Sequence, residues 1–439
     1  MKNLIIGIQF LCIAFSSIVI GPMVTGLDVS LSLFACGACT LIYHYFTKRK
    51  IPIFFGGCLA VVAGCLEITK DYGLGAFFGA SLVCSLLYIV FGLIFYKFNK
   101  NIIDKFLPAS IRTSVVVLIG FTLLPIAMSN MVAFSSNGDF VWDAFLISFL
   151  TSAILIYLSN YSSGLYKSTS IIIAMICGCL FVAFISPEEI NLSVLENQPF
   201  FSLPWENAMK NDKYALPFVF DINAILILFP LFISVFSQHI GSLFVMQEVM
   251  NDKTIVQEEK GLTRSCFALA ITNAFSSFFG CLPITDYAEV TGSVIATEEK
   301  HPIVIEISAI IAIILSFFTL FTGFISLIPV PVMGAIMFVG FGGIGMTGIK
   351  LLTQLVNLDN KRELIVSTVV LSCGIGNLAI SFDFGLKFQG IALSVLLGII
   401  VNILLIGLEN AEKMEQLHSN ADEVLRQIEL ENAKSKKNT

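Results

Sequence analysis

Two carboxylates stand close together in a short apolar part of the sequence. The stretch CLPITDYAEVTGSVIATEE (281–299) contains Asp286 and Glu289, three positions apart and shortly after Pro283. Its apolar part, 283–297, is shorter than the about 20 residues that a membrane-spanning helix needs. Carboxylates in such surroundings can hold a proton or accept hydrogen bonds from a polar ligand. Which of these they do depends on the elements that position them.

The chain is far more apolar than a soluble protein. Of its 439 residues, 56% are hydrophobic and 13% are charged, and the mean hydropathy is +0.89. Soluble domains carry about 25% charged residues. Many apolar runs are long enough to cross a lipid bilayer, so the sequence predicts an all-α polytopic membrane protein. The net charge of −6 is small, and nothing indicates binding to nucleic acid.

Fourteen apolar segments are predicted to cross the membrane. Two of them, 52–66 and 283–297, are short, and each begins with a proline. The full set is 4–21, 28–46, 52–66, 74–96, 108–128, 141–158, 168–185, 222–246, 264–281, 283–297, 303–327, 330–349, 363–381 and 389–408. The charged tail 409–439 has apolar residues at helical spacing, which predicts a short amphipathic helix.

Lysine and arginine indicate the orientation, because they are retained in cytoplasmic loops. With the N-terminus inside, the inner loops carry Lys48, Arg49, Lys50, Lys97, Lys100, Lys105, Lys167, Lys253, Lys260, Arg264, Lys300, Lys350, Lys361 and Arg362. The outer loops carry only Lys70, Lys210, Lys213 and Lys387. We therefore expect a multi-pass protein of the inner (plasma) membrane with both termini in the cytoplasm.

The two halves of the chain correspond to each other. A long outer loop, 186–221, separates them, and the short segment is the third span of each half. The fifth spans share a similar string, LIGF (118–121) and FVGF (338–341). An odd number of spans inverts the second half, and inverted repeats with matching broken segments are typical of secondary transporters. The substrate site is expected where the broken segments meet, which favours a functional role for Glu289.

The cysteines and histidines do not form a metal or catalytic motif. All eleven cysteines fall within apolar runs, and the C-x-x-C of Cys36 and Cys39 lacks further ligands, as expected of helix packing. The four histidines, at 44, 239, 301 and 418, are scattered. An enzyme is therefore disfavoured, and no metal or cofactor is predicted.

The twelfth segment is rich in glycine, which indicates close helix packing or a hinge. These glycines are Gly334, Gly340, Gly342, Gly343, Gly345 and Gly348.

Several motifs are spaced along the chain. They are KIPIFFGGCLA (50–60), SQHIG (237–241), GLTRSCFA (261–268) followed by FFGCLPITDY (278–287), EVTGSVIAT (289–297) and IPVPVMGA (328–335). Their order and spacing resemble the nucleobase–ascorbate transporter family, also called the uracil/xanthine permeases. The family writes the second motif as Ser-Glu-His-x-Gly and the fourth as Glu/Gln-Asn-x-Gly-x-x-x-x-Thr. The resemblance covers nearly the whole chain.

The resemblance implies a fold of 14 spans in two inverted 7-span repeats. A core domain would comprise residues 1–106 (spans 1–4) and 222–328 (spans 8–11). A gate domain would comprise 107–221 (spans 5–7 and the outer loop) and 329–408 (spans 12–14), before the cytoplasmic tail 409–439. Spans 3 and 10 would each contain a short strand. Members take up nucleobases with protons or sodium by alternating access, often as homodimers.

The resemblance also implies where the substrate binds. The eighth-span acid of the family falls on Gln238, and the tenth-span Glu/Gln falls on Glu289, preceded by Ala288. The small polar and aromatic positions of the third span fall on Cys58 and Leu59. These five residues are the predicted substrate contacts.

Proton coupling is assigned to Glu289, with Asp286 near enough along the chain to share the proton. His239 points about 100° away from Gln238 around a helix, so we give it a structural role. The chain departs from the family pattern at Gln9-Phe10, Gln238, Ser242, Val290 and Glu298. These departures leave the substrate and the coupling ion open.

A proton-coupled nucleobase importer is the function that these features predict. The edge of a nucleobase alternates donors and acceptors, which the amide of Gln238 and the carboxyl of Glu289 can match. The alternatives are a sodium-coupled nucleobase transporter and a carrier of sulfate or bicarbonate with the same fold, which an acid in the site disfavours. A receptor or scaffold without transport is a further alternative. Uracil, xanthine and other purine or pyrimidine bases all stay open as substrates.

Overall fold

The structure is a computed structural model of the whole chain. It describes residues 2–97, 108–132, 141–163, 165–187, 199–206, 218–251, 259–287, 290–291, 294, 300–381, 387–391, 393–409 and 411. This part of the chain is mostly helical, as expected of a membrane protein with many apolar runs.

The elements of the first half begin with α1 (Lys2–Thr25), α2 (Val29–Phe46) and strand β1 (Phe55–Gly57). A 3₁₀ turn, η1 (Leu59–Val61), leads into α3 (Val62–Tyr72). The remaining elements of this half are α4 (Leu74–Lys97), α6 (Ala109–Val132), α7 (Trp142–Tyr161), α8 (Leu165–Ser168) and α9 (Ser170–Ile185).

The second half repeats the pattern of helices interrupted by a strand. Its elements are α12 (Ile222–Met250), α13 (Glu259–Phe278), β2 (Ile284–Asp286), α15 (Pro302–Ser316), α16 (Thr319–Ser326), α17 (Val330–Leu355), α18 (Lys361–Ile375), β3 (Ala379–Ser381) and β4 (Lys387–Gln389). A further apolar helix covers Leu393–Glu409.

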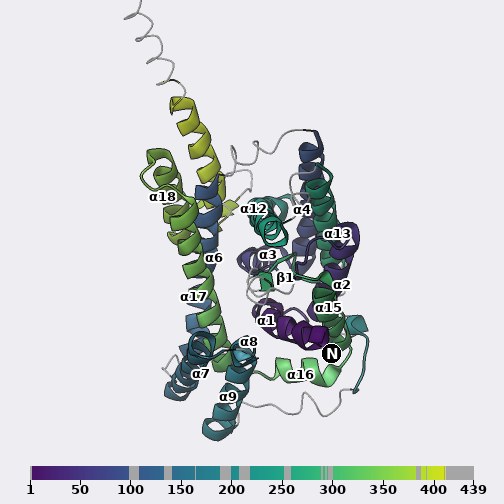
Figure 1. The fold of residues 1–439 in the computed structure, drawn as a ribbon. Coiled ribbons are helices and arrows are strands. Elements are labelled where there is room, and N and C mark those ends of the chain that lie inside the picture. The colour runs from purple at the N-terminus through teal and green to yellow at the C-terminus, as the bar shows by residue number, and fades with distance from the viewer. Residues whose placement is uncertain are drawn as a thin grey trace, which may run out of the picture.

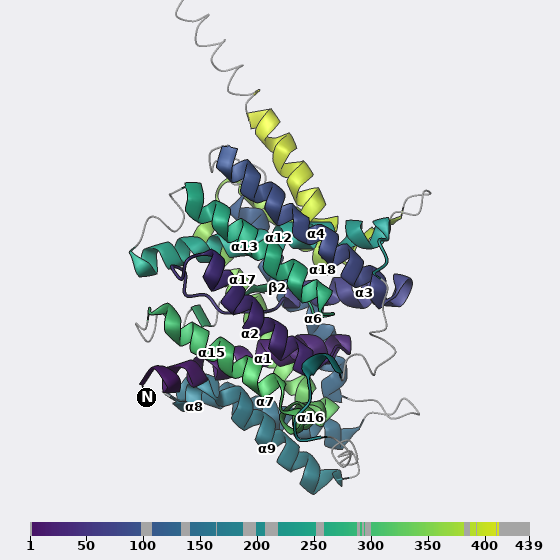
Figure 2. The ribbon, with the colours of Figure 1, turned by 90° about the vertical axis from the view of Figure 1, so that its right-hand side faces the viewer.

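The helices lie in two groups, which Figure 1 shows side by side. One group contains α6, α7, α9, α17 and α18, and its most extensive contact is between α6 and α17. The other group contains α2, α4, α12, α13 and α15, in which α13 packs on α4 and α15 packs on α2. Figure 2 shows the second group from the side, with α13 and α4 above α2 and α15.

Several described helices have the length and composition of membrane spans. Six reach at least 18 residues with an apolar window, namely Asn3–Thr25, Val29–Phe46, Leu74–Tyr96, Ala109–Val132, Trp142–Tyr161 and Val330–Leu355. Shorter apolar helices cover Ser170–Ile185, Ile222–Ile233, Pro302–Ser316 and Leu393–Glu409. The chain is therefore a multi-pass membrane protein.

Glycine brings α6 and α17 together. A Cβ added at Gly120 would lie 2.2 Å from the backbone nitrogen of Gly345, and one added at Gly348 would lie 2.5 Å from that of Val117. Small residues let membrane helices approach this closely. The prediction of close helix packing is confirmed at Gly345, Gly348 and Gly334, whereas Gly342 and Gly343 face open space.

One predicted span ends earlier than its apolar composition suggested. We expected a helix over 363–381, but α18 ends at Ile375, and Ala379–Ser381 forms a strand that pairs with Lys387–Gln389. Asn377 has a φ of 47°, in the left-handed region, which a continuing α-helix does not allow. This backbone turn, rather than the hydropathy of the segment, ends the helix.

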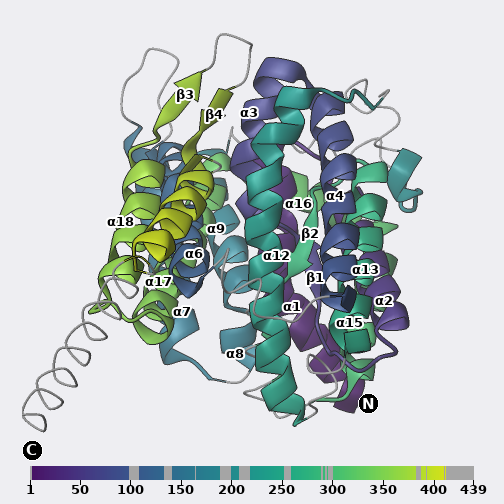
Figure 3. The same ribbon diagram turned by 90° about the horizontal axis from the view of Figure 1, so that it is seen from above.

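The first two strands lie inside the second helix group. β1 and β2 form a two-stranded antiparallel sheet, and both fall within the short apolar segments of the sequence. The pair is contacted by α1 and α2 on the side of β1 and by α12 and α13 on the side of β2 (Figure 3). Every residue of both strands is buried.

Candidate substrate site

The two broken segments meet through their strands, although more than 200 residues separate them. Phe55 pairs with Asp286, Gly56 with Thr285, and Gly57 with Ile284. Two further backbone bonds extend the pairing, from Cys58 N to Pro283 O at 2.7 Å and from Tyr287 N to Phe54 O at 3.1 Å. Each segment thus provides the partner for the other's extended backbone, as a non-helical stretch buried in protein requires.

Polar side chains from the flanking helices complete the hydrogen bonding of the strands. Asn273 of α13 accepts from Ile284 N at 3.0 Å and donates to Ile284 O at 3.2 Å. On the other strand, Phe55 N donates to Thr40 Oγ1 of α2 at 3.0 Å. Asn273 and Thr40 are both completely buried. The sequence analysis missed them, although polar residues within apolar segments are a signal of such a role.

A buried network joins β2 to three helices. His239 Nδ1 of α12 lies 2.9 Å from Asp286 Oδ1, and His239 Nε2 lies 2.8 Å from Ser265 Oγ of α13. The hydroxyl of Tyr43 on α2 lies 2.6 Å from Ser265 Oγ and 3.4 Å from His239 Nε2. The exposed fraction is 0% for His239 and 1% for Asp286. We had assigned these two residues separate roles, and the structure makes them partners.

The carboxylate determines which ring nitrogen of His239 carries hydrogen. An ionised carboxylate only accepts hydrogen bonds, so Nδ1 carries the hydrogen that faces Asp286. Ser265 can either donate to Nε2 or accept from it, because a hydroxyl does both. The network is therefore compatible with a neutral imidazole and with an imidazolium.

Several polar atoms around β2 lack a partner. Among the described residues, Thr285 Oγ1, Asp286 Oδ2 and Thr291 Oγ1 are buried and make no hydrogen bond. The hydroxyl of Ser242 faces the same Asp286 carboxylate. Buried polar groups in proteins are nearly always paired, so an unpaired carboxylate oxygen beside the paired strands indicates a place for water or a polar ligand.

Two of the predicted substrate contacts directly follow β1. Cys58 is 1% exposed, and its backbone N–H donates to Pro283 O just before β2. Leu59 begins the 3₁₀ turn and packs near Gly21 of α1. The structure thus brings Cys58 to the second broken segment and places Leu59 at the contact with the first helix.

The other predicted contacts cannot be placed in the same way. Glu289 and Ala288 lie outside the described residues, and so does the side chain of Gln238. In the sequence, Gln238 directly precedes His239, and Glu289 follows Asp286 by three residues. The His239–Asp286 contact therefore joins the two stretches that carry them.

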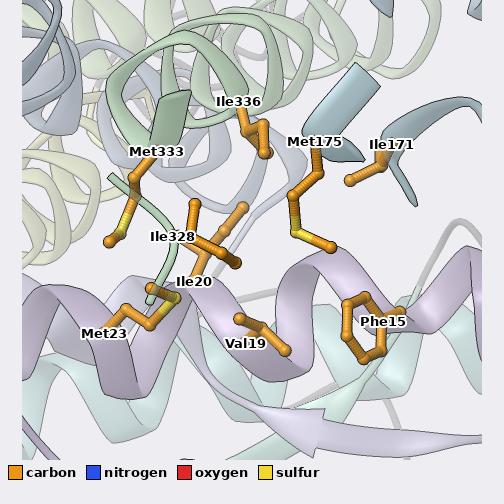
Figure 4. Close-up of a pocket in the computed structure, with 9 residues that line it drawn as sticks. All are labelled: Phe15, Val19, Ile20, Met23, Ile171, Met175, Ile328, Met333 and Ile336. Atoms are coloured by element: carbon orange, nitrogen blue, oxygen red, sulfur yellow. The ribbon is translucent and has the colours of Figure 1, made fainter. Parts of the chain in front are cut away.

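Two cavities lie away from the paired strands. One, of about 20 Å³, has only apolar side chains around it and lies between α1, α9 and α17 (Figure 4). It has room for about one water molecule, and its methionines, Met23, Met175 and Met333, offer no polar recognition. A larger one, of about 600 Å³, lies against α6, α7 and α17 and is lined mainly by apolar and aromatic side chains. Neither has the converging polar groups that a substrate site needs. A third, of about 10 Å³, is lined in part by Gly57 of β1 and Ile284 of β2 and has room for no more than about one water molecule.

No group of three or more histidine, cysteine, aspartate or glutamate side chains that could hold a metal is present in the described part of the chain. The eleven cysteines are free thiols. The Cys39 thiol donates to Thr272 O of α13 at 3.3 Å, which is a helix-packing contact.

Curated relatives match this chain along most of its length. A probable uracil permease of Haemophilus influenzae is 30% identical over 92% of this chain and 94% of its own. The uracil permease of Bacillus subtilis is 27% identical, with 94% and 95% covered. The uric acid permease PucK of Bacillus subtilis is 24% identical, with 86% and 87% covered.

Solved structures of other transporters share the fold. The structure of SLC26A9 superposes with a TM-score of 0.63 at 11% identity, covering 93% of this chain and 65% of that longer one. The transmembrane domain of the cyanobacterial bicarbonate transporter BicA gives a TM-score of 0.58 at 13% identity, covering 91% and 96%. At these identities the likeness concerns the fold alone.

A family model described as the permease family matches residues 1–381. The relatives that match the chain are named as permeases, which are transporters and not enzymes. Together with the motifs and the broken segments, this match identifies the chain as a member of the permease family of nucleobase–ascorbate transporters.

Proposed function

We propose that this protein imports a nucleobase by proton symport, with uracil as the first candidate. The observation that carries this proposal is the pairing of the two broken segments through β1 and β2. There, Thr285, Asp286 and Thr291 hold buried polar atoms without a hydrogen-bond partner among the described residues. Such groups suit a small flat heterocycle with several N–H and C=O groups. The relatives named as uracil permeases support this choice of substrate.

The proposed substrate contacts are Glu289, Gln238, Ala288, Cys58 and Leu59. Glu289 and Asp286 are the proposed acids of coupling, since carboxylates inside a membrane commonly mark a proton or substrate path. An inorganic anion is a poorer substrate, because an acid buried at the site repels it unless it is protonated.

The same proposal includes an architecture and a location. It has 14 spans in inverted repeats, with a core of 1–106 and 222–328 and a gate of 107–221 and 329–408. The core moves against the gate to expose the site to each side in turn. The protein lies in the inner membrane with both termini in the cytoplasm, and a homodimer is the assembly expected from the resemblance to the family.

Uptake of labelled uracil into cells that lack their own nucleobase permeases tests this function. We expect accumulation that falls as external pH rises, collapses with a protonophore and is insensitive to sodium. A panel of unlabelled bases then ranks the substrates by competition. Accumulation that follows a sodium gradient and ignores pH would refute proton coupling, and transport of sulfate or bicarbonate alone would refute the choice of substrate.

A further inference from the structure

A histidine and an aspartate form a buried polar pair inside the membrane protein, and neither of them is Glu289. His239 Nδ1 and Asp286 Oδ1 are 2.9 Å apart, and both side chains are completely buried. Building on the proposed proton-coupled uptake, we propose that this pair is itself a proton-binding site of the transport cycle. The imidazole of His239 takes up the proton, and Asp286 compensates its charge.

The surroundings of the pair favour the binding of one proton. The titratable groups near it are the hydroxyl of Tyr43 from α2 and the thiol of Cys58 after β1, and the thiol of Cys266 on α13 lies near Tyr43. All three types of group are ordinarily neutral at pH 7. Within the described residues, His239 is the one ion-pair partner of Asp286.

Without the extra proton, the pair therefore carries a net charge of −1 in a water-poor interior. A buried charge that lacks compensation is unfavourable. Binding of one proton makes the pair an imidazolium–carboxylate with no net charge. Binding of one proton thus removes the uncompensated charge of the pair. An importer that carries one proton with each neutral base needs a site that binds one proton in this way.

The hydrogen bonds allow the proton to be added without breaking the network. In the unloaded state, Nδ1–H donates to Asp286 and Ser265 donates to Nε2. The added proton forms an N–H bond at Nε2, which then donates to Ser265 Oγ. The serine hydrogen turns toward the oxygen of Tyr43, and the hydrogen of Tyr43 turns away from Ser265. The 2.6 Å contact between Ser265 and Tyr43 permits either hydroxyl to donate. Release of the proton to the cytoplasm reverses these steps.

The free oxygen of the carboxylate connects this proton to the substrate. Asp286 Oδ2 has no hydrogen-bond partner among the described residues, and Thr285 and Thr291 offer further unpaired hydroxyls nearby along the chain. An N–H of the base that donates to Oδ2 would favour the ionised carboxylate. The ionised carboxylate in turn favours the imidazolium of His239, so base and proton bind together.

Separating exchange from accumulation tests this site. His239→Asn removes the imidazole, retains a donor toward Asp286 and leaves Asp286 Oδ2 in place. In proteoliposomes, we expect this variant to exchange internal for external uracil within about threefold of wild type, because exchange needs no net proton movement. Under an inward proton gradient of one pH unit, accumulation should fall from at most about tenfold in the wild type to about onefold in His239→Asn. Asp286→Asn also removes the oxygen offered to the base, so it should lose both exchange and accumulation.

The second His–carboxylate contact of the chain provides a matched control. His44 Nδ1 lies 3.4 Å from Glu306 Oε1, which also bonds Arg49, so the carboxylate of this pair already has a cationic partner. Glu306→Gln should retain the wild-type ratio of accumulation to exchange. Wild-type accumulation in His239→Asn, or an equal loss of exchange and accumulation in that variant, would overturn the proposed proton site.

A failure of the proposed function can be recognised separately. If the wild type transports none of the bases, infrared difference spectra of the purified protein between pH 5 and pH 8 still report proton binding. An imidazolium signal that disappears in His239→Asn but not in Glu306→Gln would support the site. Identical spectra for wild type and His239→Asn would overturn it.

Discussion

The phenol ring of Tyr287 lies directly against the backbone of Gly56. A Cβ added at Gly56 would come 2.1 Å from the ring carbon Cζ, and the Tyr287 hydroxyl donates to Gly57 O at 3.1 Å. At Gly57 the nearest atoms to an added Cβ are those of Leu282, at 3.6 Å. The two adjacent glycines of β1 therefore differ in the space that they leave for a side chain, because only Gly56 is covered by the ring of Tyr287.

Gly56→Ala should abolish transport, and Gly57→Ala should be tolerated. The added methyl group at residue 56 would displace the ring of Tyr287, which is 4% exposed and hydrogen-bonded. This displacement would separate β2 from β1. The measurement is uptake normalised to the amount of inserted protein. Equal activity of the two variants would show that the ring does not hold the strands together.

Asn273→Leu should lower the thermal stability of the detergent-purified protein. The change leaves both backbone groups of Ile284 without their partner, and each buried unpaired group costs about 1–3 kcal/mol. Ser277→Ala is the control, because Ser277 is equally buried but donates only to Asn273 O within its own helix. The melting temperature should fall clearly in the first variant and little in the second. A similar melting temperature for both would contradict the role given to Asn273.

Glu289→Gln should reduce accumulation by about tenfold or more, equivalent to about 1.4 kcal/mol, while the protein still inserts. The amide has the size of the carboxyl group but cannot exchange a proton in the cycle. Uptake and membrane insertion are measured in the same cells. Uptake within twofold of wild type would exclude Glu289 from coupling and would leave the His239–Asp286 pair as the remaining candidate.

A polar thiol reagent should inhibit transport through Cys58, and substrate should protect. Cys58 is only 1% exposed, so the reagent reaches it when the site opens. Cys58→Ala should become resistant, whereas Cys65→Ala should stay sensitive, because Cys65 lies on α3 and contacts Thr69 of its own helix. Equal inhibition of Cys58→Ala and the wild type would place Cys58 away from the pathway.

Composition, run length and motifs are sufficient to predict the class of protein and to locate its two broken segments. Composition and run length predict membrane helices because backbone groups in lipid must be paired within a helix or a closed barrel. The short length of 52–66 and 283–297 indicated a break in each, and the described strands Phe55–Gly57 and Ile284–Asp286 lie within them. The motifs on those segments were enough to indicate the family.

Which side chains contact each other depends on the tertiary packing of segments that are far apart in the sequence. His239 and Asp286 are 47 positions apart, and Gly57 and Tyr287 are 230 apart. Periodicity indicates the face on which a side chain lies but not the partner that it meets there, because the partner depends on how distant helices pack. For the same reason, the sequence does not indicate that Asn273 binds the backbone of Ile284. It also predicts a helix where Ala379–Ser381 forms a strand. Hydropathy records the preference of a segment for the membrane, whereas backbone pairing depends on its neighbours in space.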